Sequence, residues 1–362
     1  MRIDLIQPNE LGPSEIAAWH SMQEATPTLA NPFLSPEFTL AAGRLRQESR
    51  VAVLTDGACV TGFFPFERRR FGVGVPIAGW LSACQGLIHT PAAEWDAEEL
   101  LRSCDLAVWK FDNLIFNQKP FAPYQIRTMP SPILDLSSGF DHYYTALRSK
   151  RLHFCRELER KTRKLRRESG DLHVVCDSRD SSILRTLIAW KSQQYRRTAH
   201  VDRFQQPWIR ELLENMLETR TKELSGLLSV LYAGDQPIAA QFGLRNQRKL
   251  VGWFTGYDIS YAKYSPGLIH LMLMARELTS ASIEAIHMGK GALKYAQPLK
   301  NGDILVSDGV VTAHSTLGIA YDSWDRASRF ALNTVRRHPA LHSTLDMLLR
   351  QGGIANRIYG RI

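Results

Sequence analysis

The sequence predicts a mixed α/β protein made of two successive units, and three observations support this. Residues 1–135 alternate short helical and strand patterns, and residues 227–257 hold three apolar runs separated by short turns. A proline-rich stretch at 120–132 lies between the two regions. A length of 362 residues accommodates two domains of roughly 100–200 residues each.

The composition is that of a globular protein. Hydrophobic residues make up 44% of the chain and charged residues 22%, which excludes a disordered or fibrous protein. Because no run of 18 apolar residues occurs and the N-terminus lacks an apolar segment, we expect neither a membrane-spanning helix nor a secretory signal. The five cysteines are scattered, with no CxxC pair. This pattern predicts neither a disulfide framework nor a zinc site, and it favours a cytoplasmic protein.

The first unit, residues 1–135, is predicted from alternating patterns. The Thr55-Asp56-Gly57 turn separates two apolar runs and therefore predicts a hairpin. Prolines 120, 123, 130 and 132 predict a connecting segment, at which we place the domain boundary. The expected elements are helices at 14–24 and after the turn at 31–38, and strands at 50–54, 59–67 and within 104–116.

A long basic amphipathic helix is predicted over residues 141–168, within a segment bounded at 136–170. Leu147, Phe154, Leu158 and Leu165 recur at helical spacing, and Gly170 is a natural stop. Residues 148–167 contain ten Lys or Arg against two Glu, in a chain of net charge +9. This basic face has three interpretations: a solvated surface, contact with an anionic acceptor, or docking to an anionic membrane or RNA. Aromatic residues that could stack on RNA bases are sparse there, so nucleic acid is not the expected partner.

The second unit begins with two predicted helices, at 181–196 and 207–224. Three apolar runs joined by short turns then predict an antiparallel meander. A polar loop at 258–265 leads into an apolar helix that ends near residue 278. The remaining predictions are meander strands at 227–233, 238–244 and 250–257, later strands at 283–288 and 304–313, and two basic amphipathic helices from Trp324 onward.

Ser265-Pro266-Gly267 at the start of that apolar helix is a candidate phosphate site. A glycine lets backbone N–H groups approach a phosphate closely, and the N-terminus of a helix favours negative charge. Proline suits the first helical turn, where no N–H donor is needed. A plain helix start explains the same residues, so both interpretations stay open.

Several segments together carry a resemblance to a known family. Pro237-Ile238-Ala239-Ala240, Tyr257-Asp258, Tyr264-Ser265-Pro266-Gly267 and Gly289-Lys290-Gly291 are its strongest pieces. The chain resembles the GNAT-type acetyltransferases of the CelD/BcsL group of cellulose and holdfast biosynthesis, which is related to the FemAB peptidyltransferases. The resemblance spans about residues 30–310 and is densest in 226–300.

This resemblance implies an α/β fold of tandem GNAT-like type, with mixed sheets flanked by helices and the long basic helix between or beside the domains. Residues 1–135 would be a degenerate copy, and residues 171–320 would bind acyl-CoA as co-substrate. Residues 321–362 would form basic C-terminal helices. The acyl group would pass directly from the thioester to an amine.

Direct transfer needs a backbone donor, an acid and a base. In this fold the donor that polarises the carbonyl comes from the splayed strand at Val251–Thr255. Tyr295 is the first candidate for the acid that protonates the leaving thiolate, with a packing role as the alternative. Asp258 and His287 are the candidates for the base; a turn-capping role competes for Asp258 and a structural role for His287.

Further residues are assigned to binding. No HExxH, GxSxG or Walker motif occurs, and no metal is expected. The aromatic residues among the candidates have core packing as their alternative role. The expected acyl-CoA contacts are Trp253, Phe254, Thr255, Tyr264, Ser265, Gly267 and Leu268, and the expected acceptor contacts are Gln241, Tyr257, Trp190 and Lys290.

The sequence thus predicts an acetyl-CoA-dependent N-acyltransferase acting on an amino sugar of exopolysaccharide or envelope biosynthesis, free or carried on a nucleotide or lipid. Peripheral contact with the inner face of a membrane would run through residues 148–167. Two alternatives stay open: a FemAB-like aminoacyl-tRNA-dependent transferase, and a catalytically degenerate regulator of polysaccharide assembly. The last rests on two departures from the family, His287-Met288 in place of Asp-Phe and Ala296 in place of lysine.

Overall fold

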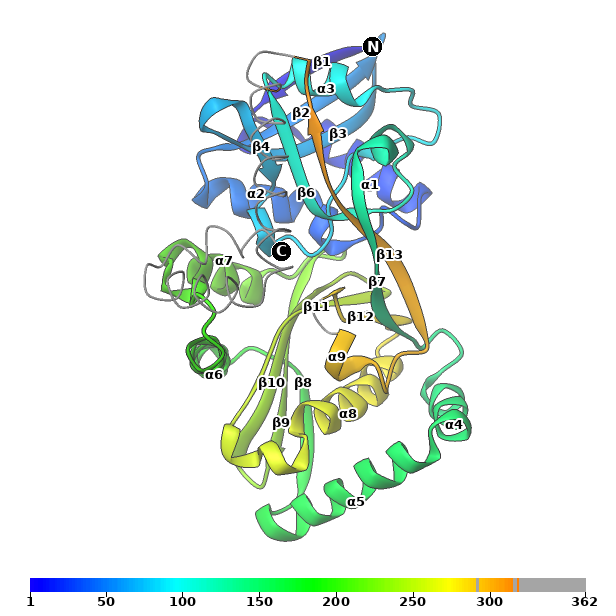
Figure 1. Ribbon diagram of the computed structural model, residues 1–362, viewed down its shortest axis with the longest axis vertical. Helices are drawn as coiled ribbons and strands as arrows, with labels where there is room; N and C mark the ends of the chain where they lie inside the picture. The colour runs from blue at the N-terminus through cyan, green and yellow to red at the C-terminus, as the bar shows by residue number, and fades with distance from the viewer. Residues whose placement is uncertain (291–292, 315–317, 319–362) are drawn as a thin grey trace, which may run out of the picture.

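A single mixed sheet runs through both halves of the chain. The computed structural model describes residues 1–290, 293–314 and 318. Within these residues thirteen strands form the sheet, in the order β1-β2-β3-β4-β6-β13-β7-β12-β11-β10-β9-β8, and β5 pairs with β3. Figure 1 shows β1–β4 at one end of the molecule and β8–β10 at the other, with β13 running between the two ends and helices around the sheet.

The N-terminal half contains the predicted helices and the predicted hairpin. A helix starts at Pro36 because Ser35 accepts a hydrogen bond from the Phe38 N–H and proline needs no donor there. The elements are β1 (Arg2–Ile6), α1 (Pro13–Ala25), α2 (Pro36–Leu45), β2 (Ser49–Asp56), β3 (Cys59–Arg69), β4 (Val73–Pro76), β5 (Ile88–His89), α3 (Ala97–Ser103) and β6 (Val108–Ile115).

The C-terminal half contains the predicted meander, helix and later strands. The strand predicted at 304–313 connects it to the first half, because it pairs with residues 125–133 on one edge and with residues 108–115 on the other. The elements are β7 (Gln125–Asp135), α4 (Phe140–Lys150), α5 (Leu152–Ser169), β8 (Leu172–Ser178), α6 (Ser181–Arg197), α7 (Pro207–Glu218), β9 (Ser225–Ala233), β10 (Gln236–Arg245), β11 (Lys249–Tyr257), α8 (Pro266–Ser280), β12 (Ala285–His287), α9 (Leu293–Ala296) and β13 (Gly302–Thr312).

The two halves repeat one strand plan. In the first, β1 through β4 pair antiparallel in sequence and β4 then pairs parallel with β6. In the second, β8 through β11 pair antiparallel and β11 then pairs parallel with β12. The tandem arrangement predicted from the sequence is therefore present in the strand pairing itself.

The proline-rich stretch 120–132 is not only a connection, as predicted, because its second part belongs to β7. Pro130 pairs with Leu305 and Pro132 with Asp303 on β13. The Pro132 carbonyl accepts from Met288 on the other side of the strand, so the missing N–H of this residue also points away from β13. Since β12 pairs with β7 only at residues 133–135, the prolines leave the long ladder intact.

One hydrophobic core joins the halves. Trp19, Phe38 and Phe63 of the first half belong to the same buried cluster as Leu212 and Phe242 of the second. This cluster lies on the face of β9–β11 that α6 and α7 cover, whereas α8 and α5 pack on the opposite face with a cluster of their own. The sheet around β11 therefore has two different surroundings, one on each face.

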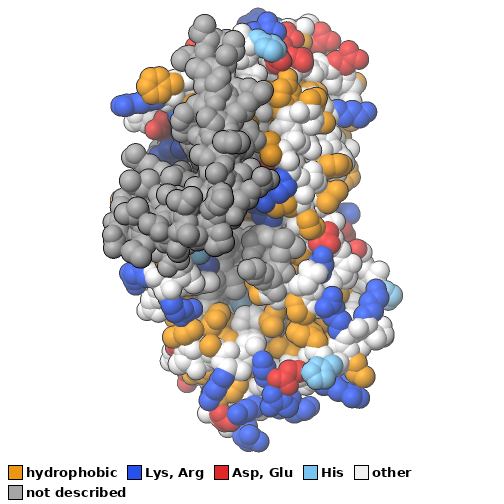
Figure 2. Space-filling view, viewed as in Figure 1, with side chains coloured by type: hydrophobic (Ala, Val, Ile, Leu, Met, Phe, Trp, Pro, Cys, Tyr) orange, Lys and Arg blue, Asp and Glu red, His pale blue; other side chains and the backbone are white. Residues whose placement is uncertain are grey.

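The single long basic helix predicted at 141–168 is instead two helices, α4 and α5. Arg151 between them has φ −139° and ψ 47°, which interrupts the helical backbone. The predicted apolar stripe is confirmed: Leu147, Leu158 and Leu165 are buried, and Phe154 packs against the same cluster. Figure 2 shows Lys and Arg side chains gathered at the end of the molecule where Figure 1 places α5.

Two remaining predictions concern membrane spans and the chain end. No helix among the described residues is both long and apolar enough to cross a bilayer. The two basic helices predicted from Trp324 onward lie outside the described residues.

Candidate active site

The site begins where β11 and β12 part. The two strands pair over three positions only, the last being Val251 with His287, after which β11 continues to Tyr257 without β12 beside it. On its other edge β11 carries a bulge: Phe242 pairs with Phe254, the next residue pairs with Gly252, and Trp253 is left over. A bulge frees backbone groups from the ladder and bends the strand. The predicted splay at Val251–Thr255 is therefore present.

A row of polar side chains crosses the α8 face of the sheet beside this gap. Gln241 of β10 pairs with Thr255 of β11 on one side and with Ser229 of β9 on the other. The Thr255 hydroxyl donates to Gln241 Oε1 at 3.4 Å, and the Ser229 hydroxyl lies 2.8 Å from His270 Nε2 of α8. Polar groups in an otherwise apolar face require a reason, and the splay supplies one.

Tyr295 of α9 joins this row. Burial raises the pKa of the Tyr295 phenol, and the facing Thr255 hydroxyl opposes that rise. The phenol is consequently protonated at neutral pH, while Tyr295 as a whole residue is 40% exposed. A protonated phenol at the open end of a splayed strand pair is placed to donate a proton.

A cavity of about 470 Å³ lies on the other side of the strand pair, between the two halves. Val251 and His287, the last paired residues of the two strands, line it. His287 is 9% exposed, and its imidazole makes no hydrogen bond within the described residues; its Nδ1 is buried without a partner. Burial, with Lys249 adding to it, lowers the pKa of His287 to about 4, so the imidazole is neutral at pH 7.

The predicted phosphate loop lies at the N-terminus of α8. Ser265 has left-handed backbone angles, φ 59° and ψ 53°, and α8 begins with Pro266 and Gly267. A side chain added at Gly267 would meet nothing within 4 Å, so the backbone here is open to a ligand. The Lys161 ammonium of α5 donates to the Ser265 hydroxyl at 3.1 Å, which brings a cation of the basic helix to this helix start.

Two of the other predicted acyl-CoA residues support this loop rather than face outward. Tyr264 is buried and its hydroxyl donates to Glu168 of α5. Leu268 is partly buried against the apolar cluster under α8. They fix the loop to α5 and to the core.

The side chains of Trp253 and Phe254 do not line the site. Trp253 donates its indole N–H to the Leu81 carbonyl at 2.8 Å and packs against Phe33 and Phe38 of the first half. Phe254 is buried against Phe204. Both side chains therefore lie in the core, and only the backbone of these two residues is left to face the gap.

Asp258 and Lys290 also have partners elsewhere. The Asp258 carboxylate accepts from the N–H and hydroxyl of Ser260 and caps the short 3-10 turn Ile259–Tyr264. Lys290, predicted to contact the acceptor, forms ion pairs with Asp308 at 3.0 Å and Asp112 at 3.6 Å. Neither side chain faces the cavity.

The structure separates the remaining acceptor candidates. Trp190 of α6 is partly buried against the shared core, and its Cβ lies 3.3 Å from the position of a Cβ on Gly256. Tyr257 is 37% exposed at the end of β11. Only Gln241 lies in the polar row beside the splay, on the face opposite the cavity.

Sequence reasoning missed most of the cavity wall. The wall residues that it missed include Lys249, at the first position of β11, and the buried residues Asn31, Cys84 and Ser131. Asn31 opens the predicted turn at 31–38, and a capping role explains it there, since its Oδ1 accepts from the Phe33 N–H. These four wall residues come from four separate segments of the chain, and no sequence pattern predicts that they meet.

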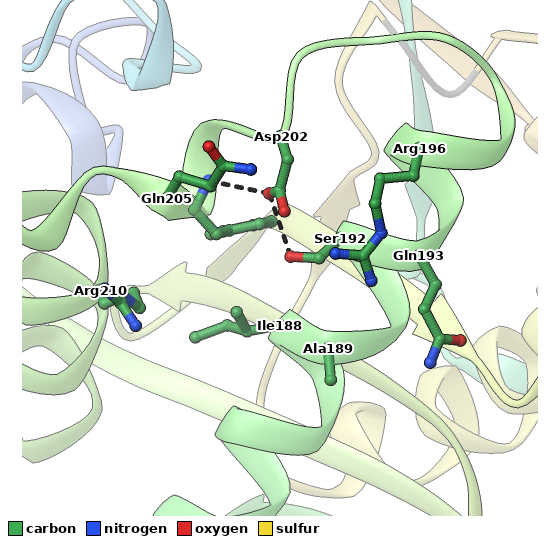
Figure 3. A pocket seen from close by; sticks show the side chains of 9 residues that line it. Ile188, Ala189, Ser192, Gln193, Arg196, Asp202, Gln205 and Arg210 are labelled. Carbon is green, nitrogen blue, oxygen red and sulfur yellow. Dashed lines mark hydrogen bonds between the residues drawn. The ribbon is translucent and has the colours of Figure 1, made fainter.

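A second pocket of about 470 Å³ lies between α6 and the start of α7 (Figure 3). Arg196 and Arg210 line it, together with Asp202. The Asp202 carboxylate accepts from the Ser192 hydroxyl at 3.0 Å and from the Phe204 N–H at 3.2 Å. Its described lining includes none of the predicted site residues.

Among the residues that the structure describes, no three His, Cys, Asp or Glu side chains gather where they could hold a metal ion.

Comparison with known proteins places the fold. Residues 152–297 match the acetyltransferase (GNAT) domain family. No curated protein matches the chain. A tandem GNAT protein from the clavulanic acid biosynthesis pathway aligns with a TM-score of 0.50 at 8% identity, over 87% of this chain and 100% of that one. FemX aligns with a TM-score of 0.51 at 10% identity, over 80% and 94%. The predicted tandem GNAT-like fold is thus confirmed, and its second half contains the segment that matches the acetyltransferase domain.

Proposed function

We propose that the chain is an N-acyltransferase that moves an acyl group from coenzyme A to the amine of a small molecule. The open splay between β11 and β12 carries this proposal, with the protonated phenol of Tyr295 on one face and the neutral imidazole of His287 on the other. The match of residues 152–297 to the GNAT domain supports the same chemistry.

Three features fit acyl-CoA. The open backbone at Gly267, the first-turn N–H groups of α8 and the Lys161 ammonium would receive the pyrophosphate. Backbone groups of the bulged segment Val251–Thr255 would polarise the thioester carbonyl. Acyl-CoA supplies the activated acyl group; the protein supplies position and protons.

The protons balance with two residues. The amine nitrogen bonds to the carbonyl carbon, the carbon–sulfur bond breaks, and its electron pair stays on sulfur. His287 takes a proton from the attacking nitrogen, and Tyr295 gives its phenol proton to the sulfur. The proton on His287 then returns to the Tyr295 oxygen through solvent, so that the amide and free CoA are the only products.

The finer assignment extends this proposal. An amino sugar of exopolysaccharide or envelope biosynthesis, free or carried on a nucleotide or lipid, is the acceptor that we propose from the resemblance to the CelD/BcsL group. The exposed basic residues of α5 would then contact an anionic carrier or the inner face of a membrane.

Calorimetric titration with acetyl-CoA, longer acyl-CoAs and free CoA tests the proposal. Micromolar binding is expected, and Gly267→Asp should weaken it at least tenfold, because the new carboxylate repels phosphate and occupies the open space. Ser14→Asp places the same charge at the start of α1 and should bind CoA like the natural protein. A folded protein that binds no CoA species would contradict the proposal.

The FemAB-like alternative draws on one observation, the exposed arginines of α5. Arg156 and Arg163 are exposed on this helix and make no ion pair with a described residue. That function predicts binding of aminoacyl-tRNA that falls steeply with salt, without affinity for CoA. The same titration therefore separates the two. Binding of CoA without transfer to any amine would instead favour a regulatory module.

A further inference from the structure

The cavity between the two halves has a chemistry that selects its ligand. It is bounded by the splay of β11 and β12 on one side and by loops of the first half on the other. Most of its wall is apolar, including Val251, Ile304 and Val306. A cavity of about 470 Å³ is the size of a small-molecule site.

The charge of the wall has one sign. Lys249 lines the cavity, and no Asp or Glu does within the described residues. Carboxylates close in sequence to the lining residues form ion pairs: Glu284 with Arg248 at 3.5 Å, Asp303 with Lys300 at 2.6 Å, and Asp112 and Asp308 with Lys290. The cavity is therefore electropositive.

Lys249 has capacity to bind a ligand. Its ammonium donates to the Pro27 carbonyl at 2.8 Å, and an ammonium has three donors, so two remain. Buried Asn31 and Ser131 line the same wall and can bond to uncharged parts of a ligand. A polyamine or a lysine side chain would bring a second cation into the cavity. A carboxylate in the wall would be needed to hold that cation, and none of the described residues that line the cavity supplies one.

The same cavity favours the reactive form of an amine. An ammonium group must lose a proton before it can attack a carbonyl, and both burial and a nearby cation lower the pKa of an amine. A neutral amine next to His287 then needs a proton acceptor only after it has attacked. The wall thus holds an amine in the form that reacts.

We infer that this cavity is the acceptor site and that it takes a small primary amine carrying a phosphate or carboxylate, which Lys249 binds. This inference rests on the proposed function, since it names the acceptor of the same reaction. It excludes polyamines and lysine-containing peptides as substrates.

Initial rates of CoA release with three amines test the inference: glucosamine 6-phosphate, glucosamine and spermidine. We expect kcat/KM to be highest for the sugar phosphate, at least tenfold above glucosamine, and spermidine to be inactive. Lys249→Met should raise KM for glucosamine 6-phosphate at least tenfold while kcat and CoA affinity stay the same, and Lys249→Arg should restore part of the loss. Lys222→Met, an exposed lysine outside the cavity, is the matched control.

A second variant tests the location independently of charge. Ala30→Leu adds bulk to the cavity wall and should raise KM for every accepted amine without changing CoA binding. The inference is overturned if the protein transfers acyl groups but uses spermidine as well as or better than glucosamine 6-phosphate, or if Lys249→Met leaves KM unchanged. If the natural protein binds no CoA, or binds CoA without transferring to any amine, the proposed function on which the inference rests is overturned instead.

Discussion

The two halves share a strand plan but differ at the point where their parallel strands part. In the second half the gap beyond Val251 and His287 is open and borders a cavity. In the first half the parallel pair of β4 and β6 ends at Gly74 with Trp109, and a loop residue fills the gap. Gln85 forms a parallel bridge with Leu114, its N–H donates to the Asn113 carbonyl, and its carbonyl accepts from the Ile115 N–H.

Side chains complete the filling of the first gap. Trp109 lies with its ring centroid 4.9 Å from Phe64, 5.0 Å from Phe111 and 4.7 Å from Phe121. The second half has a row of Gln241, Thr255 and Tyr295 beside its own gap. The same strand plan therefore yields a packed core in one half and an accessible polar gap in the other, so the fold alone does not make a site.

Removal of the phenol in the open half should have the largest effect. Tyr295→Phe should lower kcat by about 10²-fold or more, because a positioned acid contributes on this scale, while affinity for CoA stays within about twofold. Tyr124→Phe is the control in the filled half; it removes a hydroxyl that donates to Glu98 at 3.0 Å. Steady-state kinetics that show equal loss in both variants would contradict a functional difference between the halves.

Removal of the amide that fills the first gap should act on stability instead. Gln85 Oε1 accepts hydrogen bonds from the N–H groups of Asp112 and Asn113. Gln85→Leu leaves both N–H groups without this partner. We expect the free energy of unfolding in urea to fall by about 3 kcal/mol. Gln241→Leu in the open half removes one 3.4 Å hydrogen bond and should cost about 1 kcal/mol or less, with its main effect on kcat. The reverse ranking would argue against the comparison.

Acid should weaken the open half selectively. Burial lowers the pKa of His287 to about 4 and that of His270 to about 3, both below the ordinary value of 6.5. The unfolded chain therefore binds more protons as pH falls below 6.5, and each histidine should lower the free energy of unfolding by about 2 kcal/mol between pH 7 and pH 5. In the first half the His20–Glu37 hydrogen bond raises the pKa of His20, so its stabilisation is present below pH 6.5 and is lost as pH rises.

Urea unfolding of His270→Gln and His287→Gln at both pH values checks this prediction. Each variant should lose about 2 kcal/mol less than the natural protein on acidification. His20→Gln should instead lose more, because it lacks the compensating histidine. An unchanged pH dependence in the first two variants would show that these imidazoles are not kept neutral by burial.

The fold was predictable where local patterns and tertiary structure agree. The hairpin around Gly57, the meander from residue 225 and the apolar stripe of Leu147, Leu158 and Leu165 all follow from periodicity and turn residues. The prediction was wrong at β7, where Pro130 and Pro132 indicate a connection. The prolines are tolerated in β7 because one edge of this strand pairs with β12 at residues 133–135 only. The local sequence does not show that this edge lacks a long ladder.

The candidate site was only partly predictable for a similar reason. Gly267, Ser265 and Tyr295 lie in short segments with a local signature or a resemblance. Lys249 and Asn31 are 218 positions apart and meet only because the halves pack together, so no local pattern connects them. For Trp253 the difficulty is local. A bulge in β11 determines which face of the sheet its side chain lies on, and no sequence pattern predicts that bulge.

The position of β13 determines the order in which the chain can complete itself during synthesis. Residues 306–312 of this strand pair with β6, which ends at Ile115, so the partner of β6 emerges far later than β6 itself. At roughly 5–20 residues per second, the intervening chain of about 190 residues takes on the order of 10–40 s to appear. During that time β6 has an unpaired edge, which is open to association with other strands. A nascent chain of this protein is therefore most vulnerable to aggregation in its first half, although that half is made first.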